Sequence, residues 1–149
     1  MKTIKKAALG TVAALALAIG VAGTGTANAD VPGGSTILYP GQCISPNHYI
    51  AAGNTQLTFQ NDRNIVVSYA GTPTYQFPGT WNAAQQLCMQ TDGNLVAYDT
   101  ANRPVWSMDG ESQGHYYSGD ILAVQTDGNV VVYQNYGNGP ALWSTHTNR

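Results

Sequence analysis

The stretch "QTDGNLVAY", Gln90 to Tyr98, places a Gln, an Asp, an Asn, a Val and a Tyr at every second position. Three-residue hairpin loops commonly consist of a type I turn followed by a glycine in the left-handed region, and Thr91, Asp92 and Gly93 fit that form. Apolar residues alternate before and after the triplet, as in half-buried strands. The stretch therefore predicts one β-hairpin.

The hairpin sequence occurs three times. "LCMQTDGNLVAY" returns as "LAVQTDGNVVVY" and, in looser form, as "LTFQNDRNIVVSY", with the Gln positions 30 and then 35 residues apart. A tryptophan follows each copy, at Trp81, Trp106 and Trp143. Such repeats pack together because one unit cannot bury its own apolar face. We expect an all-β fold without helices, with pseudo-threefold symmetry and the three tryptophans on the axis; the β-trefoil is the competing architecture.

The N-terminal residues have the order of a signal peptide. Three lysines precede an apolar run from Ala7 to about Ala22, and Ala27 and Ala29 form an A-x-A cleavage site. A membrane anchor is the alternative, but the run has about 15 apolar residues and a span needs roughly 20. We predict a signal peptide at 1–29 and one secreted, extracellular domain at 30–149.

The charge of residues 30–149 limits the partners. All three lysines lie in 1–29, so three arginines remain against eight acidic residues, a net charge of −5. Nucleic acids and anionic membranes attract clustered Lys and Arg, which this segment lacks. We therefore expect neither nucleic acid binding nor membrane insertion.

Residues 30–149 contain two cysteines, Cys43 and Cys88. Export would allow a disulfide between them. The bond would close a loop of about 45 residues, worth roughly 4 kcal/mol in the chain-entropy model. Two separate buried thiols are the alternative. A catalytic cysteine is not indicated, because Cys88 lies in an apolar strand with no histidine nearby in sequence.

The hairpin also gathers side chains that suit a sugar. With a three-residue loop, Gln90 pairs across from Asn94, and both project from the same face as Val96 and Tyr98. Carboxylate, amide and phenol groups match the hydroxyls of a pyranose, and valine matches its C–H surface. Asp-Gly turns also occur for purely local reasons. The turn does not require the Gln and the Tyr, however, so their repetition favours a binding site that recognises without reacting.

The pattern Q-x-D-x-N-x-V-x-Y resembles the signature of the bulb-type, monocot mannose-binding lectins over nearly all of 30–149. The resemblance implies a β-prism II fold, with three four-stranded antiparallel sheets, and metal-independent binding of α-mannose without a cofactor. In that family the motif Asp and Asn hold the sugar 2-hydroxyl, Gln the 3-hydroxyl and Tyr the 4-hydroxyl, with Val against the ring carbons.

Carried over residue by residue, the resemblance gives two complete sites and one weaker site. The complete sites are Gln90, Asp92, Asn94, Val96 and Tyr98, and Gln125, Asp127, Asn129, Val131 and Tyr133. The weaker site in 60–69 is Gln60, Asp62, Asn64 and Val66. There Ser68 replaces the tyrosine, and Tyr69, one place later, would face away unless a bulge turned it back. Arg63 replaces the turn glycine.

Other features depart from the family or extend it. The family's disulfide joins cysteines within one repeat, whereas Cys43 and Cys88 lie in different repeats, so we expect a bridge between sheets. Plant members exchange C-terminal strands to dimerise, and "ALWSTHTNR" could support a homodimer in the same way. The lysine-bearing signal looks bacterial, which brings lectin-like bacteriocins into view as relatives.

We therefore predict a secreted lectin for mannose or a related sugar such as rhamnose. A lectin-like bacteriocin, or a protein-interaction or inhibitor module on the same scaffold, is the alternative. An enzyme is not indicated, because His48, His115 and His146 are scattered and "DGE" at 109–111 has the composition of a solvated turn. The sequence contains no P-loop, dinucleotide fingerprint, metal-ligand cluster or EF-hand loop.

Overall fold

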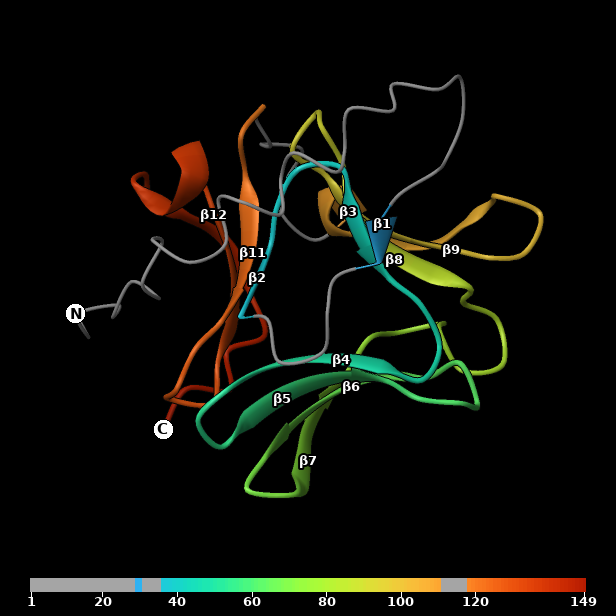
Figure 1. Cartoon of the computed structure of the whole chain (residues 1–149), viewed down its shortest axis with the longest axis horizontal. Coiled ribbons are helices and arrows are strands. Elements are labelled where there is room, and N and C mark those ends of the chain that lie inside the picture. Colours follow the sequence, from blue (N-terminus) through green and yellow to red (C-terminus); the bar gives the residue numbers. More distant parts are fainter. Residues whose placement is uncertain (1–28, 31–35, 111–117) are drawn as a thin grey trace.

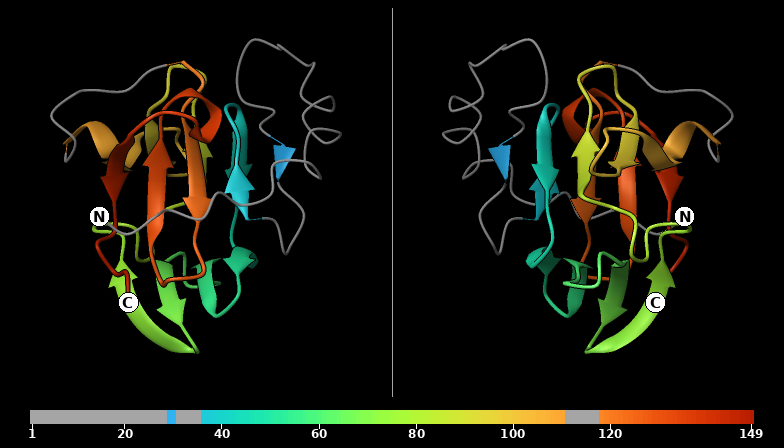
Figure 2. Two further views of the ribbon diagram at one scale, coloured as in Figure 1. Left: turned by 90° about the vertical axis from the view of Figure 1, so that its left-hand side faces the viewer. Right: turned by 90° about the vertical axis from the view of Figure 1, so that its right-hand side faces the viewer.

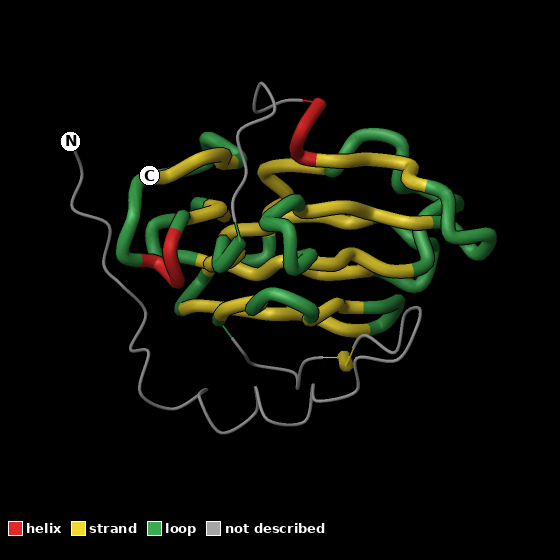
Figure 3. The backbone as a smooth tube through the Cα atoms, turned by 90° about the horizontal axis from the view of Figure 1, so that it is seen from above, coloured by secondary structure: helices red, strands yellow, loops and turns green. Residues whose placement is uncertain are grey.

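The computed structural model describes residues 29–30, 36–110 and 118–149. In these ranges the chain consists of strands and loops, with two short 3-10 turns and no α-helix (Figure 3). The strands are β1 (Ala29–Asp30), β2 (Ile37–Leu38), β3 (Gln42–Ile44), β4 (His48–Ala52), β5 (Thr55–Phe59), β6 (Ile65–Tyr69), β7 (Thr72–Gln76), β8 (Gln86–Met89), β9 (Leu95–Tyr98), β10 (Pro104–Ser107), β11 (Ile121–Val124), β12 (Val130–Tyr133) and β13 (Ala141–Ser144). The 3-10 turns are η3 (Met108–Gly110) and η4 (Asn135–Gly137).

The strands form three sheets around a shared core (Figure 1). Sheet A has the order β1-β3-β8-β9-β10, sheet B has β13-β12-β11-β2, and sheet C has β4-β5-β6-β7. The sheets contain the hairpins of repeats two, three and one respectively. The predicted architecture of three four-stranded antiparallel sheets is confirmed, and the two-residue β1 adds a parallel strand at the edge of sheet A.

The beginning of the domain completes the sheets formed by later repeats. β2 pairs with β11, where Leu38 lies opposite Leu122, and β3 pairs with β8. β2 is therefore the fourth strand of the sheet of repeat three, and β3 is the fourth strand of the sheet of repeat two. Sheet C, in contrast, forms from one contiguous segment of chain. In Figure 2 the orange and red strands of sheet B stand side by side, with the green strands of sheet C below them.

Cys43 and Cys88 form a disulfide, and they are direct register partners in β3 and β8. The expected bridge between sheets is thus wrong, because β3 belongs to the same sheet as the hairpin of repeat two. The bond links residues 45 apart in sequence. Closing a loop of that size stabilises a folded chain by about 4 kcal/mol in the chain-entropy model.

Aromatic side chains from the three sheets meet in the core. Trp106 and Trp143 are buried, with ring centroids 5.4 Å apart. The expectation that Trp81 joins them is wrong, because its side chain is 62% exposed. Phe77 takes that place, with its centroid 4.7 Å from Trp106 and 5.7 Å from Trp143.

The strand register explains this substitution. Trp106 pairs with Ala97 of the neighbouring strand, and at the equivalent place in sheet C Tyr75 pairs with Val67. Tyr75 of β7 therefore packs against the core at the position of Trp106, Phe77 follows directly after the strand, and Trp81 lies in the loop beyond. None of the helical segments in the described ranges is long and apolar enough to cross a membrane.

Candidate functional site

The predicted hairpin turn is present in repeat two. The backbone N–H of Gln90 donates to the carbonyl oxygen of Asn94 at 2.9 Å, and that of Gly93 donates to the Gln90 carbonyl at 3.0 Å. Gly93 has a φ of +93°, in the region that favours a residue without Cβ. Equivalent backbone bonds close the turns of repeats one and three. The motif residues of repeats one, two and three are called site one, site two and site three below.

The motif aspartate belongs to the turn and also remains available to a ligand. One carboxylate oxygen of Asp92 accepts from the backbone N–H of the asparagine two residues on, at 2.9 Å. Asp62 and Asp127 make the same bond at 3.0 Å. The second carboxylate oxygen has no hydrogen-bond partner among the described residues. It can therefore accept from a ligand hydroxyl without disturbing the turn.

A Gln–Tyr pair completes sites two and three. The Gln90 side-chain amide donates to the phenol oxygen of Tyr98, and Gln125 donates to Tyr133 at 2.5 Å. Each pair leaves the glutamine carbonyl oxygen as an acceptor and the phenol O–H as a donor. Burial raises the pKa of both phenols above 10.0, and the nearby motif aspartate raises it further against the opposing effect of the glutamine bond. Both phenols therefore keep their protons at neutral pH.

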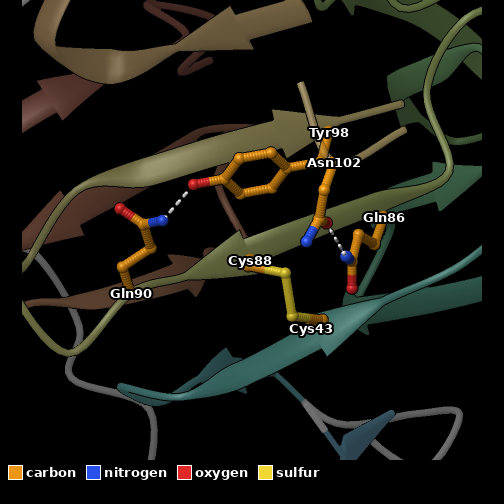
Figure 4. Close-up of a disulfide and its surroundings, with 6 residues drawn as sticks. All are labelled: Cys43, Gln86, Cys88, Gln90, Tyr98 and Asn102. Atoms are coloured by element: carbon orange, nitrogen blue, oxygen red, sulfur yellow. Dashed lines mark hydrogen bonds between the residues drawn. A yellow bond between two sulfur atoms is a disulfide. The ribbon is translucent and has the colours of Figure 1, made fainter. Parts of the chain in front are cut away.

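Site two opens into a hollow of about 480 Å³ beside the disulfide. Gln90, Asp92 and Tyr98 line it together with Cys88. Figure 4 shows Gln90 pointing at the Tyr98 hydroxyl, with the disulfide beneath them joining β3 to β8. The disulfide thus fixes one wall of this site.

Site three has an apolar neighbourhood instead. Val131 and Tyr133 pack with Ile37, Ile121 and Ala123 in a cluster separate from the main core. Ile37 and Ala123 are register partners in β2 and β11, at the place that the two cysteines take in sheet A. The Gln–Tyr pair is therefore the same in sites two and three, but the adjoining wall differs.

Threonine hydroxyls orient the motif asparagine, and the sequence interpretation missed them. The Thr145 hydroxyl donates to Asn129 Oδ1 at 3.0 Å, and the backbone N–H of Thr147 donates to the same atom at 3.2 Å. With its oxygen held this way, the Asn129 amide N–H groups remain as ligand donors. The repeats give no common signal for this contact, because repeat two has Met108 two places after its tryptophan and Thr80 precedes Trp81 in repeat one.

The asparagines of the other repeats are held less firmly. The Thr80 hydroxyl lies 3.2 Å from Asn64 Oδ1 and 2.8 Å from the Phe77 carbonyl oxygen, and no backbone N–H of a described residue adds a second bond to Asn64 Oδ1. In repeat two Met108 takes the position of Thr145, and Asn94 Oδ1 is buried with no hydrogen-bond partner among the described residues. The three sites therefore share a backbone turn but differ in how the amide is positioned.

Site one lacks the phenol, as the sequence indicated. β6 pairs regularly with β5, and the bulge in this part of sheet C adds Thr74 to β7 instead. No bulge therefore turns Tyr69 back to the site. The Tyr69 ring lies against the turn of repeat three, with the Arg149 guanidinium carbon 5.4 Å from its centroid. Gln60, Asn64 and Val66 still share one hollow, of about 400 Å³.

The histidines and the remaining acidic residues of the described ranges do not gather around a metal site. In these ranges, no group of three or more His, Cys, Asp and Glu side chains is placed to hold a metal ion. His48 lies in β4 and His146 follows β13, while His115 and Glu111 lie outside the described residues. Asp109 is in the exposed turn η3 and accepts a hydrogen bond from Ser107.

Comparisons with known proteins agree with this geometry. The chain is 36% identical over 118 residues to a mannose-specific lectin of Aloe arborescens, covering 76% of this chain and 98% of that protein. No family model matches the chain.

Solved structures show the same likeness. A monomeric monocot mannose-binding lectin from Gastrodia elata superposes with a TM-score of 0.66 and 30% identity, covering 77% of this chain and 100% of that one. The mannose-specific agglutinin of snowdrop, Galanthus nivalis, solved with methyl α-D-mannoside, gives a TM-score of 0.58 and 31% identity, covering 77% and 99%.

Proposed function

Since the chain belongs to the family of bulb-type mannose-specific lectins, we propose that it binds mannose or a related sugar non-catalytically, through sites two and three. The observation that carries this proposal is the Gln–Tyr pair, which has the same hydrogen-bond direction at both sites. The proposed sugar contacts are Gln90, Asp92, Asn94, Val96 and Tyr98, and Gln125, Asp127, Asn129, Val131 and Tyr133.

Each site offers a set of donors and acceptors that matches vicinal hydroxyls. The free oxygen of Asp92 accepts from one hydroxyl, and the amide of Asn94 donates to it. The carbonyl oxygen of Gln90 accepts from the next hydroxyl, and the phenol of Tyr98 donates to a third. Val96 packs against ring carbons. Because the polar groups meet a neutral polyol through hydrogen bonds alone, we expect the sites to recognise a sugar without transforming it.

One such site is expected to bind a single sugar weakly, with Kd in the millimolar range, about −4 kcal/mol. Linked sites raise the overall affinity for a branched glycan, because the second contact forms at high effective concentration. We therefore propose mannose-rich glycans on surfaces, rather than free sugar, as the physiological partners.

The test is retention on a mannan column followed by elution with methyl α-D-mannoside. Asp92→Asn combined with Asp127→Asn keeps an oxygen for each turn but removes the free carboxylate acceptor, so the double variant should fold and lose most of its retention, because only repeat one then remains. Methyl α-D-galactoside is the control eluent. Retention that free mannoside does not compete would overturn the proposal. Biological activity that survives the double substitution would indicate protein recognition by the same scaffold.

Secretion and assembly are also proposals. The lysine-bearing, apolar residues 1–29 support export of a bacterial protein cleaved after Ala29, and mass spectrometry of the exported protein would test the cleavage site. A homodimer formed by C-terminal strand exchange would require β13 to leave β12, its partner in the same chain. Sedimentation at several concentrations would reveal such a dimer.

A further inference from the structure

Repeat one carries a second hollow, separate from the one that Asn64 and Val66 line, in which residues outside the motif accompany the motif residues Gln60 and Asp62. The hollow has a volume of about 540 Å³ and is lined by Asn47, His48, Tyr49, Thr58, Phe59, Gln60, Asn61 and Asp62. Gln60 also lines the hollow of site one on the other side. The two hollows therefore meet at the motif glutamine and together cross the outer face of sheet C.

The new hollow corresponds by register to the hollow of site two. The backbone N–H of Asn47 donates to the Phe59 carbonyl at 2.8 Å, as that of Gly41 donates to the Met89 carbonyl at 2.7 Å. Counting from these bonds, Tyr49 takes the position of Cys43. The disulfide wall of site two is thus replaced in repeat one by an exposed aromatic ring.

Tyr49 is suited to hold a sugar ring. Its side chain is 41% exposed, and it stands opposite Thr58 in the register of β4 and β5. Gln60 follows Thr58 two residues later, on the same face of the sheet. The negative face of an aromatic ring attracts the weakly positive C–H edges of a pyranose, while Thr58 and Gln60 can bond its hydroxyls.

Gln60 is free to serve both hollows. The glutamines of sites two and three each donate to a tyrosine, whereas Gln60 has no side-chain hydrogen bond to any described residue. Beyond it, Gln76 lies opposite Val66, where Ser107 and Ser144 stand in the other sheets. In repeat one, therefore, Ser68 stands where the other repeats have the motif tyrosine, and Gln76 stands where they have a serine.

We propose that repeat one binds two linked sugars in a groove that runs from Tyr49, past Gln60, to Gln76. The groove crosses four strands, roughly 14 Å at the usual spacing between strands, which exceeds the width of one pyranose ring. This inference rests on the proposed lectin function and extends it. Sites two and three take terminal single sugars, and repeat one takes an internal or terminal disaccharide unit.

The experiment isolates repeat one in the full chain with Asp92→Asn and Asp127→Asn. Methyl α-D-mannoside and α-linked mannobiose are titrated while backbone amide NMR signals of Tyr49, Gln60 and Gln76 are followed. We expect mannobiose to bind about tenfold more tightly than the monosaccharide, given roughly 1.4 kcal/mol from the added ring contact. The groove amides at both ends should shift together.

Two further substitutions on that background test the ends of the groove. Tyr49→Ala should abolish the preference for mannobiose, and Gln76→Ser should weaken it. Tyr136→Ala is the matched control, because Tyr136 is an exposed tyrosine outside the groove, at 52% exposure. Dispersed amide spectra establish that each variant is folded.

The outcomes separate this inference from the lectin function itself. Equal affinity for the two sugars, or a preference that survives Tyr49→Ala, overturns the groove while leaving sites two and three intact. An unsubstituted protein that binds neither sugar at any of the three repeats overturns the lectin function and the groove together.

Discussion

In repeat two the motif valine stands opposite Ser107, and a tyrosine closes the site from the end of β9. In repeat one the corresponding valine stands opposite Gln76, and Ser68 takes the place of the tyrosine. The backbone turns are nevertheless the same, with equal Gln-to-Asn hydrogen bonds of 2.9 Å. The two turns are therefore alike, and the side chains that differ lie outside them, so we expect these side chains to cause any difference in ligand between the two repeats.

The largest expected effect concerns the core beneath repeat one. Phe77→Ala should destabilise the protein by about 3–5 kcal/mol, because a fully buried ring between Trp106 and Trp143 would leave a cavity. Trp81→Ala should change the free energy of unfolding by about 0.5 kcal/mol or less, because that side chain is exposed. Denaturant unfolding with the disulfide intact measures both. A larger loss of stability from Trp81→Ala than from Phe77→Ala would contradict the conclusion that Phe77, rather than Trp81, fills the core.

The second-largest expected effect concerns the hydroxyl of Thr145, which has no counterpart in repeat two. Thr145→Val should cost about 1–3 kcal/mol, because it leaves the buried backbone N–H of Val130 without its 3.1 Å acceptor. It also removes the donor to Asn129, so mannoside affinity at site three should fall. Thr145→Ser retains the hydroxyl and is the control. If site three bound sugar equally well in the Val variant, the positioning role would be refuted.

The third effect follows from the raised pKa of Tyr98 and Tyr133. A phenol whose folded pKa exceeds its unfolded value stabilises the fold below about pH 10 and loses that contribution as pH rises through the folded pKa. Sugar binding should therefore hold across neutral pH and weaken about fivefold above pH 10, when each phenol loses its donor proton. Mannoside titration by calorimetry at several pH values measures this. Tyr98→Phe with Tyr133→Phe should bind weakly without the alkaline step.

A fourth experiment gives repeat one the two side chains that repeat two has at the corresponding positions. Ser68→Tyr with Gln76→Ser should give Gln60 a phenol to donate to and should improve monosaccharide binding there by about 1 kcal/mol, the value of one added hydrogen bond. The preference for a disaccharide should fall at the same time. NMR titration on the background that silences sites two and three would show both changes. A variant in which neither changes would mean that these two positions do not set the ligand.

Much of this fold could be predicted because its signals are local. The period-two alternation and the Asp-Gly turn determine a hairpin within about ten residues, and three copies imply three sheets. The pairing of Gln90 with Asn94 followed from loop length alone. Side chains of a regular strand point alternately to its two faces, and this alone predicted that Tyr69 faces away from the site.

The features that sequence reasoning missed depend on contacts between distant segments. Trp81 was assigned to the axis because it is a tryptophan, whereas Phe77, the residue directly after β7, lies there. The bridge from Cys43 to Cys88 was expected between sheets, but β3 joins a sheet whose other main strands come more than 40 residues later. Similarly, Thr145 reaches Asn129 across 16 residues. None of these contacts produces a periodic pattern of residues that could be recognised in a single sequence.

The smallest expected effect concerns the turn itself. Arg63 has a φ of +68° where repeats two and three have glycine, and a side chain there is strained. Arg63→Gly should stabilise the protein by about 0.5–1 kcal/mol, while the reciprocal Gly93→Arg should destabilise it by a similar amount. Arg63→Ala keeps the Cβ and should bring no gain, so it separates backbone strain from the loss of charge. Thermal unfolding of the three variants measures the differences; a gain from alanine equal to that from glycine would show that charge, rather than backbone conformation, distinguishes the turn of repeat one.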